Sequence, residues 1–201
     1  MNKKTITAFL IMAVVAVVVV FGFKKLSRYA YTREPEVTDT TELGKLLNKD
    51  LENQYPATPR EVMKFYNRVN SLLYNSEEIS DTQFEELLKQ MRMLFDQELL
   101  SENSFEDQLK AFQKDVNDYQ DNKKRIVSYS LPENSAVTYY ETDGRQMASL
   151  EVGYMLKEKD SYSKMTEEFI LRQDEDKNWK ILGWMLGEEQ PEKNDEAQEE
   201  E

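Results

Sequence analysis

The sequence contains no cysteine and no histidine. Without cysteine, the chain can form no disulfide bond, offers no thiolate nucleophile and cannot build a cysteine-ligated zinc site. Without histidine, it lacks the usual general base near neutral pH and the commonest metal ligand. Ser-His-Asp and Cys-His mechanisms are therefore excluded, and we expect neither a metal nor a cofactor. Any catalysis would have to use Asp, Glu, Tyr, Lys, Ser or Thr.

Basic residues are scarce relative to acidic ones. The chain has 26 Lys and Arg against 39 Asp and Glu, which gives a net charge of −13. Because such an acidic body repels phosphate backbones, we expect no nucleic-acid partner. The last segment, Glu188–Glu201, has Ala197 as its only apolar residue and cannot offset its chain entropy by burial. It is predicted to be a disordered acidic tail; a tail that sequesters cations or docks a partner is the alternative.

One long hydrophobic run lies near the start of the chain. Thr5–Phe23, TITAFLIMAVVAVVVVFGF, has 19 residues and no charge. As a helix it would span about 28 Å, close to the thickness of a bilayer's hydrocarbon core. A cleaved signal peptide is the alternative, but the run exceeds a typical signal's apolar region, and KKLSRYAY after it has no small-x-small cleavage site. Residues 1–23 are therefore predicted to be an uncleaved single-pass anchor in the cell membrane, with the lipid bilayer as partner.

Two features of the sequence favour opposite orientations of this anchor. Counting Lys and Arg on the two flanks slightly favours a cytoplasmic domain. A short lysine-led start followed at once by an apolar run is instead typical of secretory signals. We predict an extracytoplasmic soluble domain and retain the cytoplasmic orientation as the alternative.

Past the anchor, Lys24–Ala57 is predicted to be a juxtamembrane connector. Within it, Thr41–Asn53 carries four leucines on one helical face, which indicates a short amphipathic helix that packs on its own domain rather than on a partner. The folded domain is predicted to span Thr58–Gly187.

Three capped helices are predicted to open this domain. Thr58-Pro59-Arg60-Glu61 combines an N-cap, a proline at the first helical position and the acidic residue of a capping box, so a helix is expected over Pro59–Tyr74. Ser80 repeats the capping pattern for a second helix, whose apolar face continues to Leu99. Ser104 opens a third helix that continues to about Asp121.

The apolar period then changes to that of strands. Asp143-Gly144 is a favourable hairpin dipeptide, and antiparallel neighbours joined by short turns predict a meander. The fold class is therefore α+β, with three helices packed on one face of a five-strand antiparallel sheet. The predicted strands are Arg125–Leu131, Ala136–Thr142, Gln146–Glu158, Ser163–Gln173 and Asn178–Gly187.

Two stretches resemble the NTF2-like superfamily, the cystatin-like cone. They are TPREVMKFYNRV at the start of the first helix and MTEEFILRQDEDKNWKILGW at the end of the domain. With the anchor and NQYPATPREV ahead of the domain, the chain also resembles a membrane-anchored group from Gram-positive anaerobic bacteria. The resemblance covers about Thr58–Gly187 and implies a curved sheet wrapped around helices to form a cone with an apolar pocket. The commonest version places a strand pair between the second and third helices, where this sequence has no strand signal.

The carboxylates offer few catalytic candidates. Asp174, Asp176 and Asn178 match the first positions of a calcium loop, but Trp179 stands where glycine is required, so a hairpin turn is expected. Glu151, in the longest strand, is the one weak candidate for a general base, since burial would raise its pKa. Strand alternation places it on the face opposite the apolar residues, which is typical of a wet outer face.

Four aromatic residues could line a pocket, although ordinary core and rim packing is the alternative. They are Tyr66, Tyr140, Tyr154 and Trp184. We therefore expect a membrane-tethered, non-catalytic NTF2-like binding or interaction domain of the bacterial cell envelope, with an envelope protein or a small apolar ligand as partner. An isomerase- or lyase-like enzyme with a carboxylate base is the first alternative, and a cytoplasm-facing membrane scaffold is the second. A closed cavity with an inward Asp or Glu would favour the enzyme.

Overall fold

A computed structural model describes residues 41–76 and 78–187. The predicted anchor Thr5–Phe23, the first part of the connector and the predicted acidic tail Glu188–Glu201 lie outside the described residues. Within the two described ranges, no helix has the length and apolar character needed to cross a membrane.

The three predicted capped helices are present, together with two shorter ones. The side chains of Thr58, Ser80 and Ser104 each accept a hydrogen bond from the N–H three residues on, and Ser80 forms a complete capping box with Gln83. These caps satisfy N–H groups that a helix leaves unpaired at its start. The helices are α2 (Glu42–Leu47), α3 (Pro59–Asn75), α4 (Asp81–Arg92), α5 (Gln97–Glu102) and α6 (Phe105–Asp121).

The second predicted helix ends earlier than its apolar pattern indicated. Helix α4 stops at Arg92, Met93 and Leu94 form a turn, and Phe95 then forms an isolated parallel bridge with Ile181. The N–H of Asp96 bonds to the Ile181 carbonyl, 2.9 Å away, and the Asp96 side chain then caps α5. Continuation of one helix to Leu99 was therefore a wrong prediction, because backbone pairing with a distant strand replaces the helical hydrogen bonds here.

The sheet has five antiparallel strands, as predicted, but it is not a simple meander. The strand order is β1-β3-β4-β5, and β2 also pairs with β3. β1 lies along one half of the β3 edge (Ile126 opposite Leu156) and β2 along the other half (Tyr140 opposite Met147). A 14-residue strand is about 46 Å long, enough for two short strands end to end. The strands are β1 (Lys124–Ser130), β2 (Thr138–Thr142), β3 (Arg145–Glu158), β4 (Ser161–Gln173) and β5 (Trp179–Leu186), with a 3-10 turn at Asn134–Ala136.

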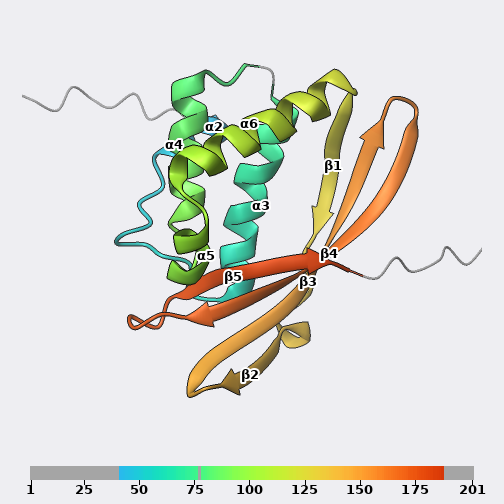
Figure 1. Cartoon of the computed structure of the whole chain (residues 1–201). Coiled ribbons are helices and arrows are strands. Elements are labelled where there is room, and N and C mark those ends of the chain that lie inside the picture. Colours follow the sequence, from blue (N-terminus) through green and yellow to red (C-terminus); the bar gives the residue numbers. More distant parts are fainter. Residues whose placement is uncertain (1–40, 77, 188–201) are drawn as a thin grey trace, which may run out of the picture. The chain divides into compact units, whose positions relative to one another are not determined.

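The core lies between the helices and one face of the sheet (Figure 1). Every second residue of β3 from Ala148 to Leu156 is buried, and Phe169 and Leu171 of β4 are fully buried beside them. Helix α2 packs against α3 and α4 through Leu46, which is also fully buried. The leucine face of the connector helix therefore packs on the rest of the domain.

Candidate ligand-binding pocket

An open cavity of about 420 Å³ lies between α3, α6 and the inner face of the sheet. Its size is in the range of small-molecule sites. We call it the aromatic pocket, because six aromatic side chains line it. Its lining residues are Tyr66, Asn70, Tyr74, Gln108, Ala111, Phe112, Asp115, Tyr119, Ile126, Tyr154, Leu156, Met165, Glu167 and Trp184.

Tyr66 and Tyr154 form the inner part of this pocket, and both were pocket candidates from the sequence. Tyr66 lies on the core face of α3, and Tyr154 lies on the inward face of β3; they are 5% and 4% exposed. The Tyr154 hydroxyl is buried and has no hydrogen-bond partner of acceptable geometry among the described residues. Burial, together with the nearby Tyr66 and Glu167, raises the pKa of the Tyr154 phenol, so this hydroxyl stays neutral.

Trp184, the third candidate, reaches the pocket because of a bulge in β5. Ile170 of β4 pairs with Gly183, but the next residue, Leu171, pairs with Ile181, so Leu182 is the extra residue. A bulge of this kind re-aims the side chains that follow it. Trp184 is therefore opposite Phe169, with stacked rings 5.8 Å apart, and its ring centroid is 6.4 Å from that of Tyr66.

Glu167 is the inner carboxylate of the pocket. It was not among the candidate site residues predicted from the sequence. It lies two residues before the fully buried Phe169, on the same face of β4, and opposite the fully buried Val152 of β3. Burial raises the pKa of Glu167, and its contact with Tyr154 only partly offsets this effect. The alternation Met165, Glu167, Phe169 was the signal that could have identified it.

A second carboxylate lies at the pocket mouth. Asp115 of α6 is exposed and accepts a hydrogen bond from the Tyr74 hydroxyl of α3. The Tyr74 ring makes edge contacts with Phe112 at 5.5 Å and with Tyr119 at 4.6 Å. Only Val116 of α6 is buried, so this helix covers the pocket without filling it.

The other two candidates from the sequence lie away from this pocket. Tyr140 lies on β2, whose five residues are all exposed. Glu151 is exposed on β3, opposite Glu168, and its neighbours Leu150 and Val152 point to the other face. The structure thus brings Tyr66, Tyr154 and Trp184 together with Glu167 and places Tyr140 and Glu151 elsewhere.

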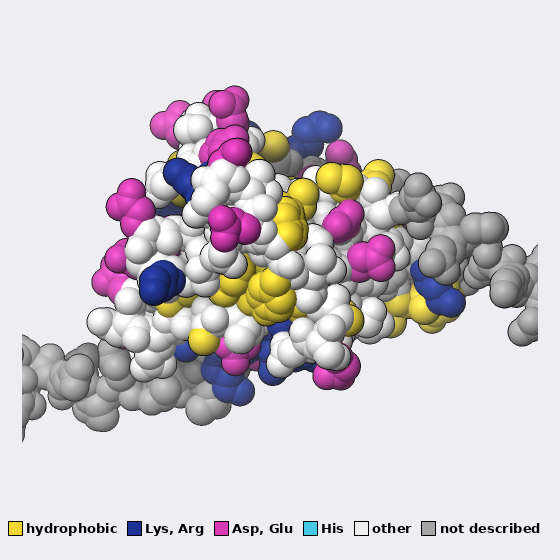
Figure 2. Space-filling model, turned by 90° about the horizontal axis from the view of Figure 1, so that it is seen from below, with side chains coloured by type: hydrophobic (Ala, Val, Ile, Leu, Met, Phe, Trp, Pro, Cys, Tyr) yellow, Lys and Arg dark blue, Asp and Glu magenta, His cyan; other side chains and the backbone are white. Residues whose placement is uncertain are grey.

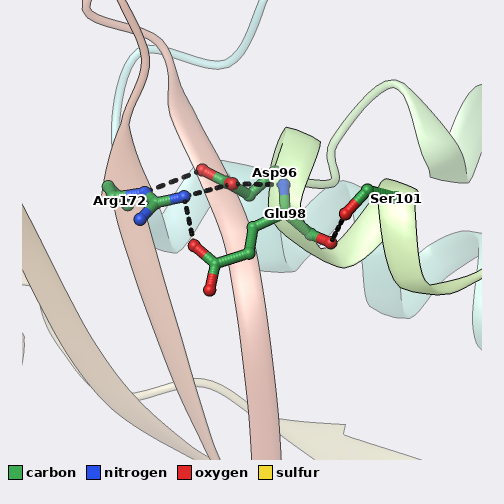
Figure 3. Close-up of polar contacts among 4 residues, drawn as sticks. All are labelled: Asp96, Glu98, Ser101 and Arg172. Atoms are coloured by element: carbon green, nitrogen blue, oxygen red, sulfur yellow. Dashed lines mark hydrogen bonds and ion pairs between the residues drawn. The ribbon is translucent and has the colours of Figure 1, made fainter.

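A second cavity, of about 430 Å³, lies beside α5 and is lined by four cationic and two acidic side chains. At its centre, Arg172 of β4 forms ion pairs with Asp96 and Glu98 at the start of α5 (Figure 3). Burial alone would raise the pKa of Asp96, but hydrogen bonds from Arg172 and from the Glu98 N–H hold it below its ordinary value. Because these charges already have partners, we interpret Arg172, Asp96 and Glu98 as a structural ion-pair cluster.

The acidic turn between β4 and β5 is a hydrogen-bonded hairpin. The Asp174 carboxylate accepts bonds from the N–H groups of Asp176 and Asn178, at 3.0 and 2.8 Å. Across residues 41–76 and 78–187, no group of three or more Asp or Glu side chains is placed to hold a metal ion.

Exposed large apolar side chains occur on the strands in the described part of the chain. Hydrophobic side chains gather in the middle of the face shown in Figure 2, with acidic ones around them. A surface contact with another protein would therefore use the sheet rather than the helices. The exposed residues are Val127, Tyr139, Tyr140, Tyr162, Trp184, Met185 and Leu186.

A family model matches most of the chain. The model of a family described as a domain of unknown function, DUF6715, matches residues 1–184. No curated protein matches the chain.

Proposed function

We propose that this chain, which belongs to the DUF6715 family, is a membrane-tethered, non-catalytic NTF2-like domain that binds a small molecule in its aromatic pocket. One observation carries the proposal: an open cavity of about 420 Å³ lies between α6 and the inner face of the sheet, and six aromatic side chains line it. Aromatic walls around a cavity of this size are typical of sites that bind a small molecule.

The arrangement of layers supports the NTF2-like part of this proposal. The helices lie on one face of an antiparallel sheet (Figure 1). The aromatic pocket lies between α6 and that face. A cone with an internal pocket, which the resemblance implies, would have layers of this kind. The region between α4 and α6 contains α5 and a single bridge at Phe95, where the commonest version has a strand pair.

The tether is the uncharged run Thr5–Phe23, with the folded domain on the extracytoplasmic side. Such a tether raises the effective concentration of the domain near partners and ligands of the cell envelope. Protease treatment of intact cells tests the orientation: we expect the folded domain to be digested. If the domain survives until the cells are lysed, the cytoplasm-facing scaffold replaces this proposal.

Binding is tested with the full chain in dodecyl maltoside micelles, using empty micelles as the blank. Two probes of equal shape are titrated by calorimetry: benzyl(2-hydroxyethyl)dimethylammonium and its neutral carbon isostere 3,3-dimethyl-4-phenylbutan-1-ol. We expect saturable binding of at least one probe, abolished by Ala111→Trp, which places a large ring in the pocket. Lys110→Trp, on the exposed part of α6, is the matched control. If neither probe binds, or if both variants bind like the wild type, the pocket is not a binding site.

Glu167 favours a second function, the isomerase- or lyase-like enzyme. A half-buried carboxylate with a raised pKa is suited to proton abstraction. The pocket is open to solvent, whereas such chemistry gains from a site that excludes water, so binding remains the first proposal. Conversion of cyclohex-3-enone to its conjugated isomer, followed by ultraviolet absorbance, tests this function. Activity lost in Glu167→Gln would support the enzyme; equal rates with and without protein would reject it for this substrate class.

A further inference from the structure

The charges that line the aromatic pocket are all acidic. Glu167 lies inside and Asp115 at the mouth, while no Lys or Arg is among the lining residues that the structure describes. Neither carboxylate forms an ion pair within the described ranges. Desolvating a carboxylate without a cation is costly, and an entering cation would offset that cost, whereas an anion would be repelled.

The pocket walls add a second feature that suits a cation. The faces of aromatic rings attract cations, most strongly where water is excluded. Lys124 already lies over the Tyr119 ring, with its Nζ 4.7 Å from the ring centroid, but it is not a lining residue of the pocket. Tyr66 and Trp184, with centroids 6.4 Å apart, form a further aromatic wall beside Glu167.

The third feature is the Tyr154 hydroxyl, which lies beside Glu167. Tyr154 is 4% exposed, lines the pocket, and its hydroxyl has no hydrogen-bond partner of acceptable geometry in the described part of the chain. This neutral hydroxyl is the one group among the described residues whose contact lowers the pKa of Glu167, so it leaves the negative charge of the carboxylate unbalanced.

From these three features we infer that the aromatic pocket binds an organic cation with an apolar body, of the alkylammonium or arylammonium class. This inference rests on the proposed binding function and adds the charge of the ligand to it. The ammonium group lies near Glu167 and the Tyr66–Trp184 wall. The apolar body extends between α6 and the sheet towards the mouth at Asp115.

The two isosteric probes test this inference, because they differ only in the charge of one central atom. We expect the ammonium probe to bind the full chain in dodecyl maltoside about tenfold more tightly than the neutral alcohol, which corresponds to about 1.4 kcal/mol. Glu167→Gln should reduce this preference several-fold, through weaker binding of the ammonium probe. The matched control is Glu168→Gln, on the adjacent, outward position of the same strand, which should preserve the preference.

The outcomes separate the two proposals. Equal binding of both probes to the wild type, blocked by Ala111→Trp, would overturn the cation inference and leave the binding pocket intact. A preference that persists unchanged in Glu167→Gln would also overturn it. Absence of binding by both probes would overturn both proposals.

Discussion

Two of the charged residues of strand β4, five positions apart, are in opposite situations. Arg172 is 15% exposed and contacts two carboxylates, Asp96 and Glu98 (Figure 3). Glu167 is half-buried, faces the aromatic pocket and has no ion pair among the described residues. The pKa of Asp96 is lowered by its partners, whereas burial raises the pKa of Glu167. A charge with partners on the same chain holds the fold together; a buried charge without them indicates a place for a ligand.

The largest expected effect comes from removing the carboxylate of the paired cluster. Asp96→Ala leaves Arg172 without its closest partner and removes the N-cap of α5, so we expect a loss of roughly 3–5 kcal/mol in the free energy of unfolding. Urea denaturation measures this. Glu98→Gln is the control: the Glu98 side chain is 65% exposed, so a loss below about 1 kcal/mol is expected. Similar losses for both variants would show that Asp96 is not the main partner.

The next effect is the opposite pH dependence of the two carboxylates. The folded protein binds the Glu167 proton more tightly than the unfolded chain, so ionised Glu167 lowers stability at neutral pH, and this penalty fades as pH falls through its folded pKa. Glu167→Gln should therefore be more stable than the wild type at pH 7, with the difference shrinking on acidification. The other titratable groups that line the pocket are Tyr66, Tyr74, Asp115, Tyr119 and Tyr154, none of them cationic.

For Asp96 the sign reverses. The pKa of Asp96 in the folded protein lies below the ordinary value of 3.8. The contribution of ionised Asp96 to the free energy of unfolding is therefore fully present above pH 3.8 and is lost as the pH falls through the folded pKa. Denaturation midpoints of Glu167→Gln and Asp96→Asn are compared with that of the wild type from pH 3 to 8. As the pH rises, the midpoint of Glu167→Gln should move above that of the wild type, and the midpoint of Asp96→Asn should move below it. Parallel profiles would contradict the contrast between the two residues.

Two tyrosine hydroxyls allow the same comparison, between a polar group with a partner and one without, for uncharged groups. The Tyr55 hydroxyl donates to the Trp179 carbonyl at 2.8 Å, while the buried Tyr154 hydroxyl has no partner of acceptable geometry in the described chain. Tyr55→Phe should cost about 1 kcal/mol in unfolding free energy, and Tyr154→Phe should be neutral or stabilising. Thermal denaturation of both variants measures the difference. A larger loss for Tyr154→Phe would show that its hydroxyl has a partner after all.

The smallest effect is expected on the opposite face of the sheet. Glu151 and Glu168 are directly opposite each other on β3 and β4, and like charges in this position are destabilising. Glu151→Gln should therefore raise the free energy of unfolding by roughly 0.2–0.5 kcal/mol. High salt should reduce this gain by screening the exposed pair. A loss of stability would indicate a role for Glu151 that its position does not suggest.

Features decided by local chemistry could be predicted from the sequence, and features decided by distant pairing could not. The caps at Thr58, Ser80 and Ser104 depend on side chains three residues from their partners, and all three are present. The end of helix α4 at Arg92 depends on backbone pairing with Ile181, which is far along the chain. The apolar pattern that continues to Leu99 therefore could not predict it.

The candidate site shows the same limit. Alternation on β3 placed Tyr154 inward, and the same rule applied to β4 would have placed Glu167 beside it. Trp184 breaks that rule, because the bulge at Leu182 shifts the alternation of β5 by one residue. Its position in the pocket could not be derived from the period of the strand alone.

The most direct test of the account is the titration of the Glu167 carboxyl by carbon-13 NMR in the full chain, with Glu167→Gln used to assign the signal. We predict a pKa above the ordinary value of 4.5 in the free protein, because the carboxyl is half-buried without a cation. We also predict that the pKa falls when the ammonium probe is added. A pKa at or below 4.5 in the free protein would show that Glu167 is solvated or already paired, and it would contradict the central claim.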